Sequence, residues 1–534
     1  MADPDNETIL LRGARIYRSA QDRRPASALL VRAGRVAWIG DGADAPSTRR
    51  VVDLGGSTVL PGLTDCHLHL FSLALARRQI AFSTLAPDSI AGVLALLRQG
   101  AGRFGPGEWV QGCEINEDRL AERRLPTRAE LDAAFPERPV LLRRYCGHAA
   151  VFNTMAMHSL GIPEAAPDTQ FGHYGRAADG TLDGSAWERA AEAIFRRAPG
   201  PDPAQMAADI RAVLGECLRL GITALCEAAV GFVIGYDREA EVWERLRGAP
   251  GPLPVRMGFM AQLTAAEAAA RGLSPTLGPD WTADTLKFFA DGIIGGRTSA
   301  LTEPFCDRGG CGGFVLPEAL LADEIFAAHA AGWRVAVHAT GDRAIAHVAE
   351  SFERAQAAAP RPDPRHRIEH CFVPPEGMFA RLSRQGTCVV MQPGFVWRMG
   401  RSAAEGLGPA RMATAYPAQS VLAAGARLAF SSDAPTGPLS PWRGVQTAVE
   451  RLGPHGARLG AGEAVDLRAA VDAYIAGGAV AMGHEGFRGT LAPGAAADLA
   501  AFANDPLTGD PSRLHETRCH FAMTRGRIVL HEAG

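Results

Sequence analysis

The sequence predicts an α/β fold: a distorted (β/α)8 TIM barrel with a large insertion after its first strand, and a small β-sandwich domain built from both chain termini. Apolar β-type segments alternate with Ala- and Leu-rich helical segments through the middle of the chain, a pattern typical of repeated β-α units. Short strand-like segments separated by Gly turns occupy both ends. The length of 534 residues is sufficient for one large barrel with additions.

The barrel is predicted from ten apolar segments, of which a closed barrel uses eight. The stretch between His69 and Gly221 is roughly 150 residues long, which is too long for one β-α unit. We therefore place EWVQGCEIN and PVLLRRYCGH in an insertion over about residues 72–205 that covers the catalytic end of the barrel. The remaining segments are the predicted barrel strands: VLPGLTDCHLH, GITALCEA, PVRMGFM, TLKFFADG, WRVAVHATGD, RHRIEHC, TCVVMQP and RLAFSSDAP.

The predicted domains follow from this assignment. Residues 61–482 form the barrel together with its insertion. Residues 1–60 and 483–534 are both rich in strand-like segments, and we expect them to pair into the small β-sandwich domain. Such a pairing is reasonable because the termini of a chain often lie close to one another.

The composition excludes several classes of function. A net charge of −3 provides no basic surface for a nucleic-acid backbone. We find no uncharged apolar run long enough to span a membrane, and the acidic start MADPDNETIL lacks the basic region of a secretory signal. Ten cysteines without a CxxC pair indicate neither a disulfide framework nor a structural zinc site. We expect a cytoplasmic protein that acts on a small molecule.

Lys287 is the only lysine among 55 basic residues, and all the others are arginines. Because arginine replaces lysine at every other basic position, Lys287 is a candidate for chemistry that a guanidinium cannot perform. An amine can lose its proton, attack a carbonyl or take up carbon dioxide, whereas a guanidinium stays protonated. Composition alone leaves open the alternative that the lysine was retained by chance at an indifferent position.

Ionisable residues fall at the carboxyl ends of predicted barrel strands, where the catalytic groups of such barrels converge. Residues i and i+2 of a strand point to the same face, so both imidazoles of the HLH motif can approach one ion. A single histidine in an apolar strand is commonly a core residue, but four of them with one amine and one carboxylate indicate a metal site. The six candidate ligands are His67, His69, Lys287, His338, His370 and Asp433.

This set of residues resembles the amidohydrolase superfamily, and within it the YtcJ-like branch that includes N-substituted formamide deformylases. The resemblance spans nearly the whole chain and implies the same barrel with a large insertion after its first strand. The motif DGHA is common in this branch where the present sequence has Tyr145-Cys146-Gly147-His148-Ala149, so the specificity of relatives is not carried over. The motifs that carry the resemblance are LPGLTDCHLH (60–69), RPVLLRRYCGHAAVFN (138–153), LKFFADGIIGGRTSAL (286–301), HATGDRAI (338–345), RHRIEH (365–370), SSDAP (431–435) and GTLAPGAAADL (489–499).

The resemblance implies a role for each candidate ligand. His67 and His69 would bind the more buried divalent ion together with Asp433, and His338 and His370 would bind a second ion. A water molecule activated by the ions would be the nucleophile. Asp433 is also implied as the catalytic group that takes the proton of this water and returns it to the leaving nitrogen.

The resemblance further implies that Lys287 is carboxylated by carbon dioxide and offers two oxygens between the ions of a binuclear metal centre. Such a role explains why arginine does not replace this lysine. Imidazole and carboxylate ligands suit Zn²⁺, and Mn²⁺, Fe²⁺ and Co²⁺ are compatible with the same set.

Five further residues are predicted to belong to the site, and four of them have two readings. His148, on the insertion, is a candidate catalytic donor to the substrate carbonyl oxygen or else a loop histidine. Glu227 either contacts the substrate or hydrogen-bonds a ligand histidine. Arg297 clamps an anionic group of the substrate or braces its own loop. Asp342 positions the substrate or pairs within its loop, and Tyr145 belongs to the segment of the insertion that we expect to face the substrate.

The resemblance therefore predicts a metal-dependent hydrolase of a C–N bond in an amide, an N-substituted formamide or a cyclic amide, with a homodimer as the family expectation. The same site could instead perform ester or carbamate hydrolysis, deamination or decarboxylation. Deaminase relatives with a single metal usually lack the lysine of the fourth strand, so Lys287 argues against that branch. A non-catalytic scaffold relative is expected to lose metal ligands, and none of the six is missing.

Overall fold

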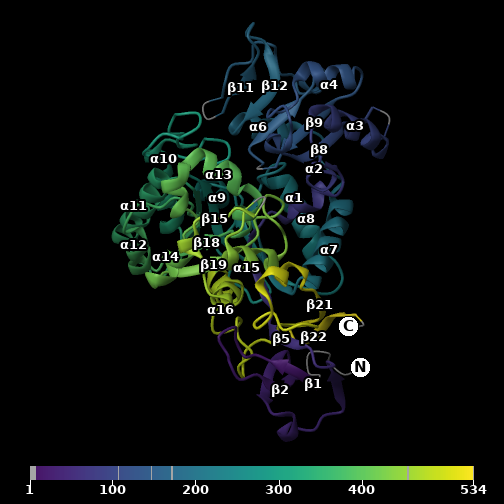
Figure 1. Cartoon of the computed structure of the whole chain (residues 1–534), viewed down its shortest axis with the longest axis vertical. Coiled ribbons are helices and arrows are strands. Elements are labelled where there is room, and N and C mark those ends of the chain that lie inside the picture. Colours follow the sequence, from purple (N-terminus) through teal and green to yellow (C-terminus); the bar gives the residue numbers. More distant parts are fainter. Residues whose placement is uncertain (1–7, 106, 146, 170–171, 454–455, 533–534) are drawn as a thin grey trace.

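The chain forms a central barrel that lies between two further sheets. Figure 1 shows the computed structural model, in which all residues are described except 1–7, 106, 146, 170–171, 454–455 and 533–534. A sheet from the segment after the first barrel strand lies at one end of the barrel, and a sheet of strands from both chain ends lies at the other (Figure 1).

Eight parallel strands form a nearly closed barrel of the type that the sequence predicts. Each predicted barrel segment overlaps one of these strands, and the burial of most strand residues explains why most of the segments are rich in apolar residues. In the order of their pairing, the strands are β6 (Leu63–Leu68), β13 (Ile222–Val230), β14 (Arg256–Ala261), β15 (Trp281–Phe289), β16 (Arg334–Ala339), β17 (Arg367–His370), β18 (Cys388–Met391) and β19 (Arg427–Phe430).

Backbone hydrogen bonds connect the ends of the first and last barrel strands. The N–H of Asp433 donates to the carbonyl of His67 at 2.8 Å, and the N–H of His69 donates to the carbonyl of Ala434 at 2.8 Å. These bonds bring the HLH motif of β6 beside the segment that follows β19. Residues from opposite ends of the barrel sequence thus become neighbours.

Helices cover the outside of the barrel. Helix α7 illustrates how the sequence specifies them: Asp202 accepts the N–H of Gln205 at its start, Pro203 occupies the first turn, and Met206 and Ile210 are buried. The helices of this part of the chain are α1 (Leu70–Ala76), α7 (Pro203–Arg219), α8 (Tyr236–Gly248), α9 (Ala265–Ala270), α10 (Glu318–Ala330), α11 (Asp342–Ala358), α12 (Met378–Gln385), α13 (Gly394–Ala413), α14 (Ala418–Ala423), α15 (Pro441–Glu450), α16 (Leu467–Asp472) and α17 (Gly478–Ala481).

The segment between α1 and α7 contains a sheet of six strands, here called the inserted sheet. The segments EWVQGCEIN and PVLLRRYCGH form its strands β8 and β9 and do not enter the barrel. Its elements are β7 (Ile80–Ala81), α2 (Phe82–Leu85), α3 (Ile90–Gly100), β8 (Val110–Ile115), α4 (Arg128–Ala134), β9 (Val140–Arg144), β10 (Ala149–Phe152), α5 (Thr154–Ser159), β11 (Tyr174–Arg176), β12 (Leu182–Trp187) and α6 (Arg189–Arg197).

Strands from both ends of the chain pair in one sheet of eight strands, here called the terminal sheet. Its two halves meet where β5 pairs with β20 in antiparallel register. The sandwich arrangement of this sheet and the domain boundaries stay predictions. The strands are β1 (Thr8–Ile16), β2 (Ala26–Arg32), β3 (Arg35–Gly40), β4 (Arg50–Asp53), β5 (Thr58–Pro61), β20 (Leu499–Phe502), β21 (Cys519–Thr524) and β22 (Arg527–His531).

Within the described part of the chain, no helix combines the length and the apolar character that crossing a membrane requires. The cytoplasmic location and the homodimer stay predictions.

Candidate metal centre

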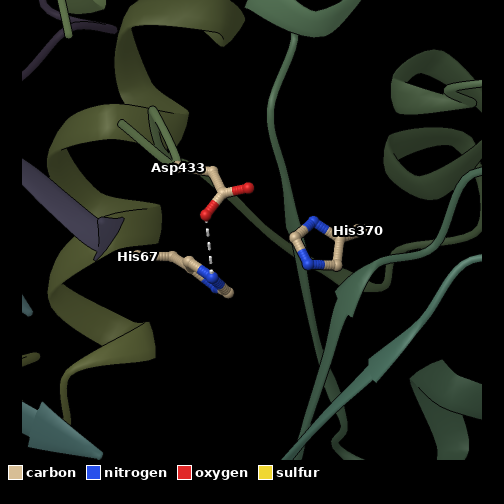
Figure 2. A group of neighbouring side chains, drawn as sticks. All are labelled: His67, His370 and Asp433. Atoms are coloured by element: carbon tan, nitrogen blue, oxygen red, sulfur yellow. Dashed lines mark ion pairs between the residues drawn. The ribbon is translucent and has the colours of Figure 1, made fainter. Parts of the chain in front are cut away.

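Three buried side chains converge at the carboxyl end of the barrel. His67 of β6, His370 of β17 and Asp433, which follows β19, each offer a ligand atom, and these atoms all lie within 4.8 Å of one another. Figure 2 shows the carboxylate of Asp433 facing the two imidazoles, with Oδ1 of Asp433 3.4 Å from Nε2 of His67. The spacing of imidazole and carboxylate atoms is that of a potential metal site.

The other predicted ligands lie around these three residues. Nε2 of His69 is 3.2 Å from Oδ1 of Asp433, and the ring centroids of His338 and His370 are 4.5 Å apart. Lys287, near the end of β15, lines the same cavity as these residues. The structure therefore brings the residues that the sequence places at separate strand ends to one end of the barrel.

Three of these histidines hydrogen-bond a protein acceptor through one ring nitrogen. The second ring nitrogen of each is then the one that can coordinate a metal ion. Nδ1 of His67 lies 2.5 Å from Oε2 of Glu369, and Nδ1 of His370 lies 2.8 Å from Oε1 of Gln392. Nε2 of His338 lies 2.8 Å from the carbonyl oxygen of Gly292. Hydrogen bonds of this kind fix the orientation and tautomer of metal-binding histidines.

Sequence reasoning missed Glu369 and Gln392. Glu369 is wholly buried, and Arg367 on the same strand donates to it at 2.6 and 3.0 Å. Burial works to raise the pKa of Glu369, but the charge of Arg367 and the contact with His67 lower it well below its usual value. Glu369 therefore stays a carboxylate. Its signal in the sequence is a carboxylate two residues after Arg367 in a predicted strand, directly before a predicted ligand.

The centre contains polar atoms that lack a hydrogen-bond partner among the described residues: Nε2 of His67, Nζ of Lys287 and Oδ1 of Asp433. Their side chains are all buried. A buried polar atom without a partner carries a large desolvation cost, so such a cluster indicates a ligand that completes it. The donors are nitrogen and oxygen atoms, which fit a divalent metal ion.

The electrostatics favour the protonation states that bind metal. Burial lowers the pKa of His370 to about 3 and that of Lys287 to about 8, so the imidazole is neutral at neutral pH and a neutral amine is accessible. Burial works to raise the pKa of Asp433, but its contacts with His67 and His69 lower it well below the usual value. Neutral imidazoles and a carboxylate are the forms that coordinate a metal ion.

Two residues of the centre have a backbone conformation that is rare for non-glycine residues. The φ angles of His370 and Asp433 are 75° and 51°. Strained backbone of this kind persists where the surrounding structure overdetermines it, and it is concentrated at functional sites. The positive φ values set the direction in which the two ligand side chains leave the backbone.

A cavity lies over the centre, and its walls are largely apolar. The ring of Phe232 stacks on that of Phe289 with centroids 5.6 Å apart, and Phe395 stacks on His370. Tyr416 packs against Phe372 with centroids 4.5 Å apart. The segment of the inserted sheet closes the cavity with Glu114, Arg143, Arg144, Tyr145, Gly147 and His148.

Of the other predicted site residues, Tyr145 and His148 line this cavity, and Glu227 lies beside His69. The ring centroid of His148 is 5.8 Å from that of His338. Oε1 of Glu227 lies 3.8 Å from Nδ1 of His69, and its other oxygen accepts the N–H of Phe71 at 2.9 Å. At 3.8 Å this contact is longer than a hydrogen bond, and Nδ1 of His69 has no hydrogen-bond partner among the described residues, so both readings of Glu227 stay predictions. Burial raises the pKa of Glu227 to about 8.

Arg297 and Asp342 bind residues that are not among the described residues lining the cavity. Arg297 donates to Asp307 through Nε at 2.9 Å and to Ser402 at 3.2 Å, and Asp342 accepts the N–H of Thr302 at 2.8 Å. Neither is among the described residues that line the cavity. Cys146 lies outside the described residues, and the departure from the family motif at that position has no structural account.

Comparisons with known proteins agree with this architecture. The chain is 29% identical over 500 residues to the amidohydrolase YtcJ of Bacillus subtilis (strain 168), with 92% of each chain covered. It is 28% identical over 519 residues to the N-substituted formamide deformylase of Arthrobacter pascens, again with 92% of each chain covered. A solved structure of an uncharacterized metal-dependent hydrolase from Pyrococcus horikoshii OT3 superposes with a TM-score of 0.77 at 25% identity, covering 95% of this chain and 99% of that one.

A family match covers nearly the whole chain. The profile described as Amidohydrolase family matches residues 50–530, which include all eight barrel strands and the six predicted ligands. The motifs that carry the resemblance in the sequence lie in the same range. The chain therefore belongs to the amidohydrolase family.

Proposed function

We propose that the chain is a metal-dependent hydrolase that cleaves a C–N bond in an amide, an N-substituted formamide or a cyclic amide. The observation that carries this proposal is the cluster of unpartnered buried atoms, Nε2 of His67, Nζ of Lys287 and Oδ1 of Asp433. The printed name of the Arthrobacter pascens relative supports amides as the substrate class. The metal-dependent hydrolase of similar structure supports the need for a metal.

His67, His69 and Asp433 would hold the more buried divalent ion, and His338 and His370 would hold a second. Zinc suits these ligands, and manganese, iron and cobalt are the alternatives. A bound ion of this kind polarises the scissile carbonyl and lowers the pKa of a bound water toward ~7.

Lys287, carboxylated on Nζ by carbon dioxide, would present two oxygens to both ions. Nζ of Lys287 is buried and has no hydrogen-bond partner among the described residues, which supports this assignment. Its burial also supports it, because a carboxylated lysine shielded from bulk solvent is protected from hydrolysis.

The remaining steps are performed by side chains of the barrel and of the inserted segment. Asp433 accepts the proton of the attacking water and returns it to the leaving nitrogen, acting first as a general base and then as a general acid. His148 donates a hydrogen bond to the substrate carbonyl oxygen from the opposite wall of the cavity. Phe232 and Phe289 line the cavity beside His148 and exclude bulk water there. The exclusion of water strengthens the interactions of Asp433 and His148 with the substrate.

The walls of the cavity also restrict the substrate. Phe232, Phe289, Phe372, Phe395 and Tyr416 surround the space above the centre, so a substrate whose amide carries an apolar substituent can bury it there. A small molecule with a bulky apolar group next to the amide is therefore the substrate that these walls favour.

The test combines elemental analysis of the purified protein with a hydrolysis screen. The screen contains N-formyl, N-acyl, cyclic-amide and ester compounds, each in an aryl or branched-alkyl form and in a methyl form. We expect stoichiometric zinc, manganese, iron or cobalt, and turnover of an apolar amide that stops on chelation and returns with the metal. Turnover unchanged after exhaustive chelation, or turnover of esters alone, would contradict the proposal.

A further inference from the structure

Glu188 and His148 are joined by two hydrogen bonds. The backbone N–H of Glu188 donates to the carbonyl oxygen of His148 at 2.8 Å, and Nδ1 of His148 lies 2.8 Å from Oε2 of Glu188. Glu188 lies between β12 and α6, and His148 directly precedes β10. Because β12 pairs with β10 in the inserted sheet, the sheet itself holds the two residues in register.

The pair is held in place on several sides. Both side chains are only 13% exposed. Glu188 has φ 51° and ψ −126°, a conformation costly for a residue with a side chain and typical of functional sites. A Cβ atom on Gly292 would lie 3.0 Å from Oε1 of Glu188, so the carboxylate packs directly against the backbone whose carbonyl oxygen binds Nε2 of His338.

His148 faces the centre from this position. Its ring centroid lies 5.8 Å from that of His338 and 5.9 Å from that of Phe232, and it lines the cavity above the centre. Since Nδ1 is directed to Glu188, Nε2 is the nitrogen that His148 presents to a substrate. Burial works to raise the pKa of Glu188, but the contact with His148 lowers it, so the group beside Nδ1 is a carboxylate.

We propose that Glu188 is a positioning residue for the hydrolytic reaction, which holds His148 through Nδ1 so that its Nε2–H is directed at the carbonyl oxygen of the substrate. A carboxylate at Nδ1 fixes the ring orientation and stabilises the imidazole when both nitrogens carry hydrogen. The inference rests on the proposed function. In this proposal Glu188 contacts no substrate atom and affects the reaction only by orienting His148.

The kinetic test is a double-mutant cycle with a substrate from the hydrolysis screen. We expect Glu188→Gln to lower kcat by about 10- to 100-fold, with KM changed much less and the metal content unchanged. In the His148→Ala background the same substitution has no further effect, because the group through which Glu188 acts is gone. Glu188→Asp, which keeps the charge, retains more activity than Glu188→Gln.

Glu192→Gln is the matched control. Glu192 lies one turn further along α6, receives a hydrogen bond from Gln262 at 3.0 Å and forms an ion pair with Arg189 at 2.8 Å. We expect its kcat to equal that of the wild type. An unchanged kcat in Glu188→Gln, or losses that multiply fully in the double variant, would overturn the proposal.

A second readout needs no turnover, and it separates failure of this inference from failure of the proposed function. In NMR spectra of protein with 15N-labelled histidine, the Nδ1–H signal of His148 is identified by its absence in His148→Ala. We expect a strongly downfield Nδ1–H signal in the wild type and in Glu192→Gln, and its loss in Glu188→Ala. Retention of that signal in a folded Glu188→Ala variant refutes the pairing even if the protein hydrolyses amides as proposed.

Discussion

Nδ1 of His67 lies 2.5 Å from Oε2 of Glu369, although the two residues belong to β6 and β17, which are not neighbours in the barrel. The contact crosses the interior of the barrel below the candidate metal centre. Arg367 completes the arrangement by donating to both oxygens of Glu369 and to the carbonyl oxygen of Cys66. A buried ion pair thus orients the first histidine of the HLH motif.

Replacing Glu369 tests this arrangement. We expect Glu369→Leu to lower the free energy of unfolding of the metal-free protein by about 3–5 kcal/mol, because Arg367 remains as an uncompensated buried charge. Metal affinity falls as well, by about 10- to 100-fold, because His67 loses the acceptor that orients it. Urea unfolding and metal titration measure the two effects. The control is Glu353→Leu, which breaks a partly exposed pair with Arg381 and costs about 1 kcal/mol or less. Equal losses in both variants would contradict the role of the buried pair.

Lys287→Arg tests the need for an amine. The variant keeps the positive charge and is expected to fold, but to lose the second metal ion and most of its activity, because a guanidinium cannot take up carbon dioxide. Metal analysis and kcat report the two losses. The control is the reverse exchange, Arg12→Lys, at a site where the side chain is 58% exposed. This variant should change neither the metal content nor kcat. A fully active Lys287→Arg variant with both ions would refute the bridging role.

Asp433→Asn tests the proton carrier. The amide cannot take the proton of the attacking water, so we expect kcat to fall by about 10²- to 10⁴-fold. His67 and His69 remain, and the variant should still bind at least one metal ion. Turnover and metal content are measured on the same preparation. Near-normal turnover in the presence of bound metal would exclude Asp433 from this role.

His148→Ala tests stabilisation of the transition state by the inserted segment. If Nε2–H donates to the developing oxyanion, kcat falls by roughly 10²- to 10³-fold while KM changes little. His158→Ala is the matched control, since this histidine is exposed on α5 in the same segment and should have no effect. An unchanged kcat in His148→Ala would return this residue to a structural role.

The ligand candidates could be proposed from the sequence because their positions follow a local pattern. Each of His67, Lys287, His338 and His370 lies in a predicted strand that helical segments separate from the next, and the carboxyl ends of parallel strands share one end of a barrel. The strand period of two residues also indicated that the HLH histidines point to the same side. Convergence of these residues is a consequence of topology.

The partners of these ligands could not be proposed in the same way. Glu369 and Gln392 bind ligand histidines through contacts between strands, and Glu188 reaches His148 through the pairing of β12 with β10 in the inserted sheet. Arg297 and Asp342 carry the charges of substrate-binding residues, yet they bind Asp307 and Thr302, neither of which is among the described residues that line the cavity. Side-chain direction in loops and inserted segments depends on packing, and no periodicity in the sequence encodes it.

The sequence by itself determined the barrel strands, their order along the chain and the chemical types of the residues at their ends, because hydrophobic periodicity and strand polarity are local properties. Only the tertiary structure decided which groups orient those residues, which nitrogen of an imidazole faces the centre, and which aromatic rings enclose the cavity. These features arise from contacts between residues far apart in the chain, and such contacts exist only once the barrel and the inserted sheet have packed together.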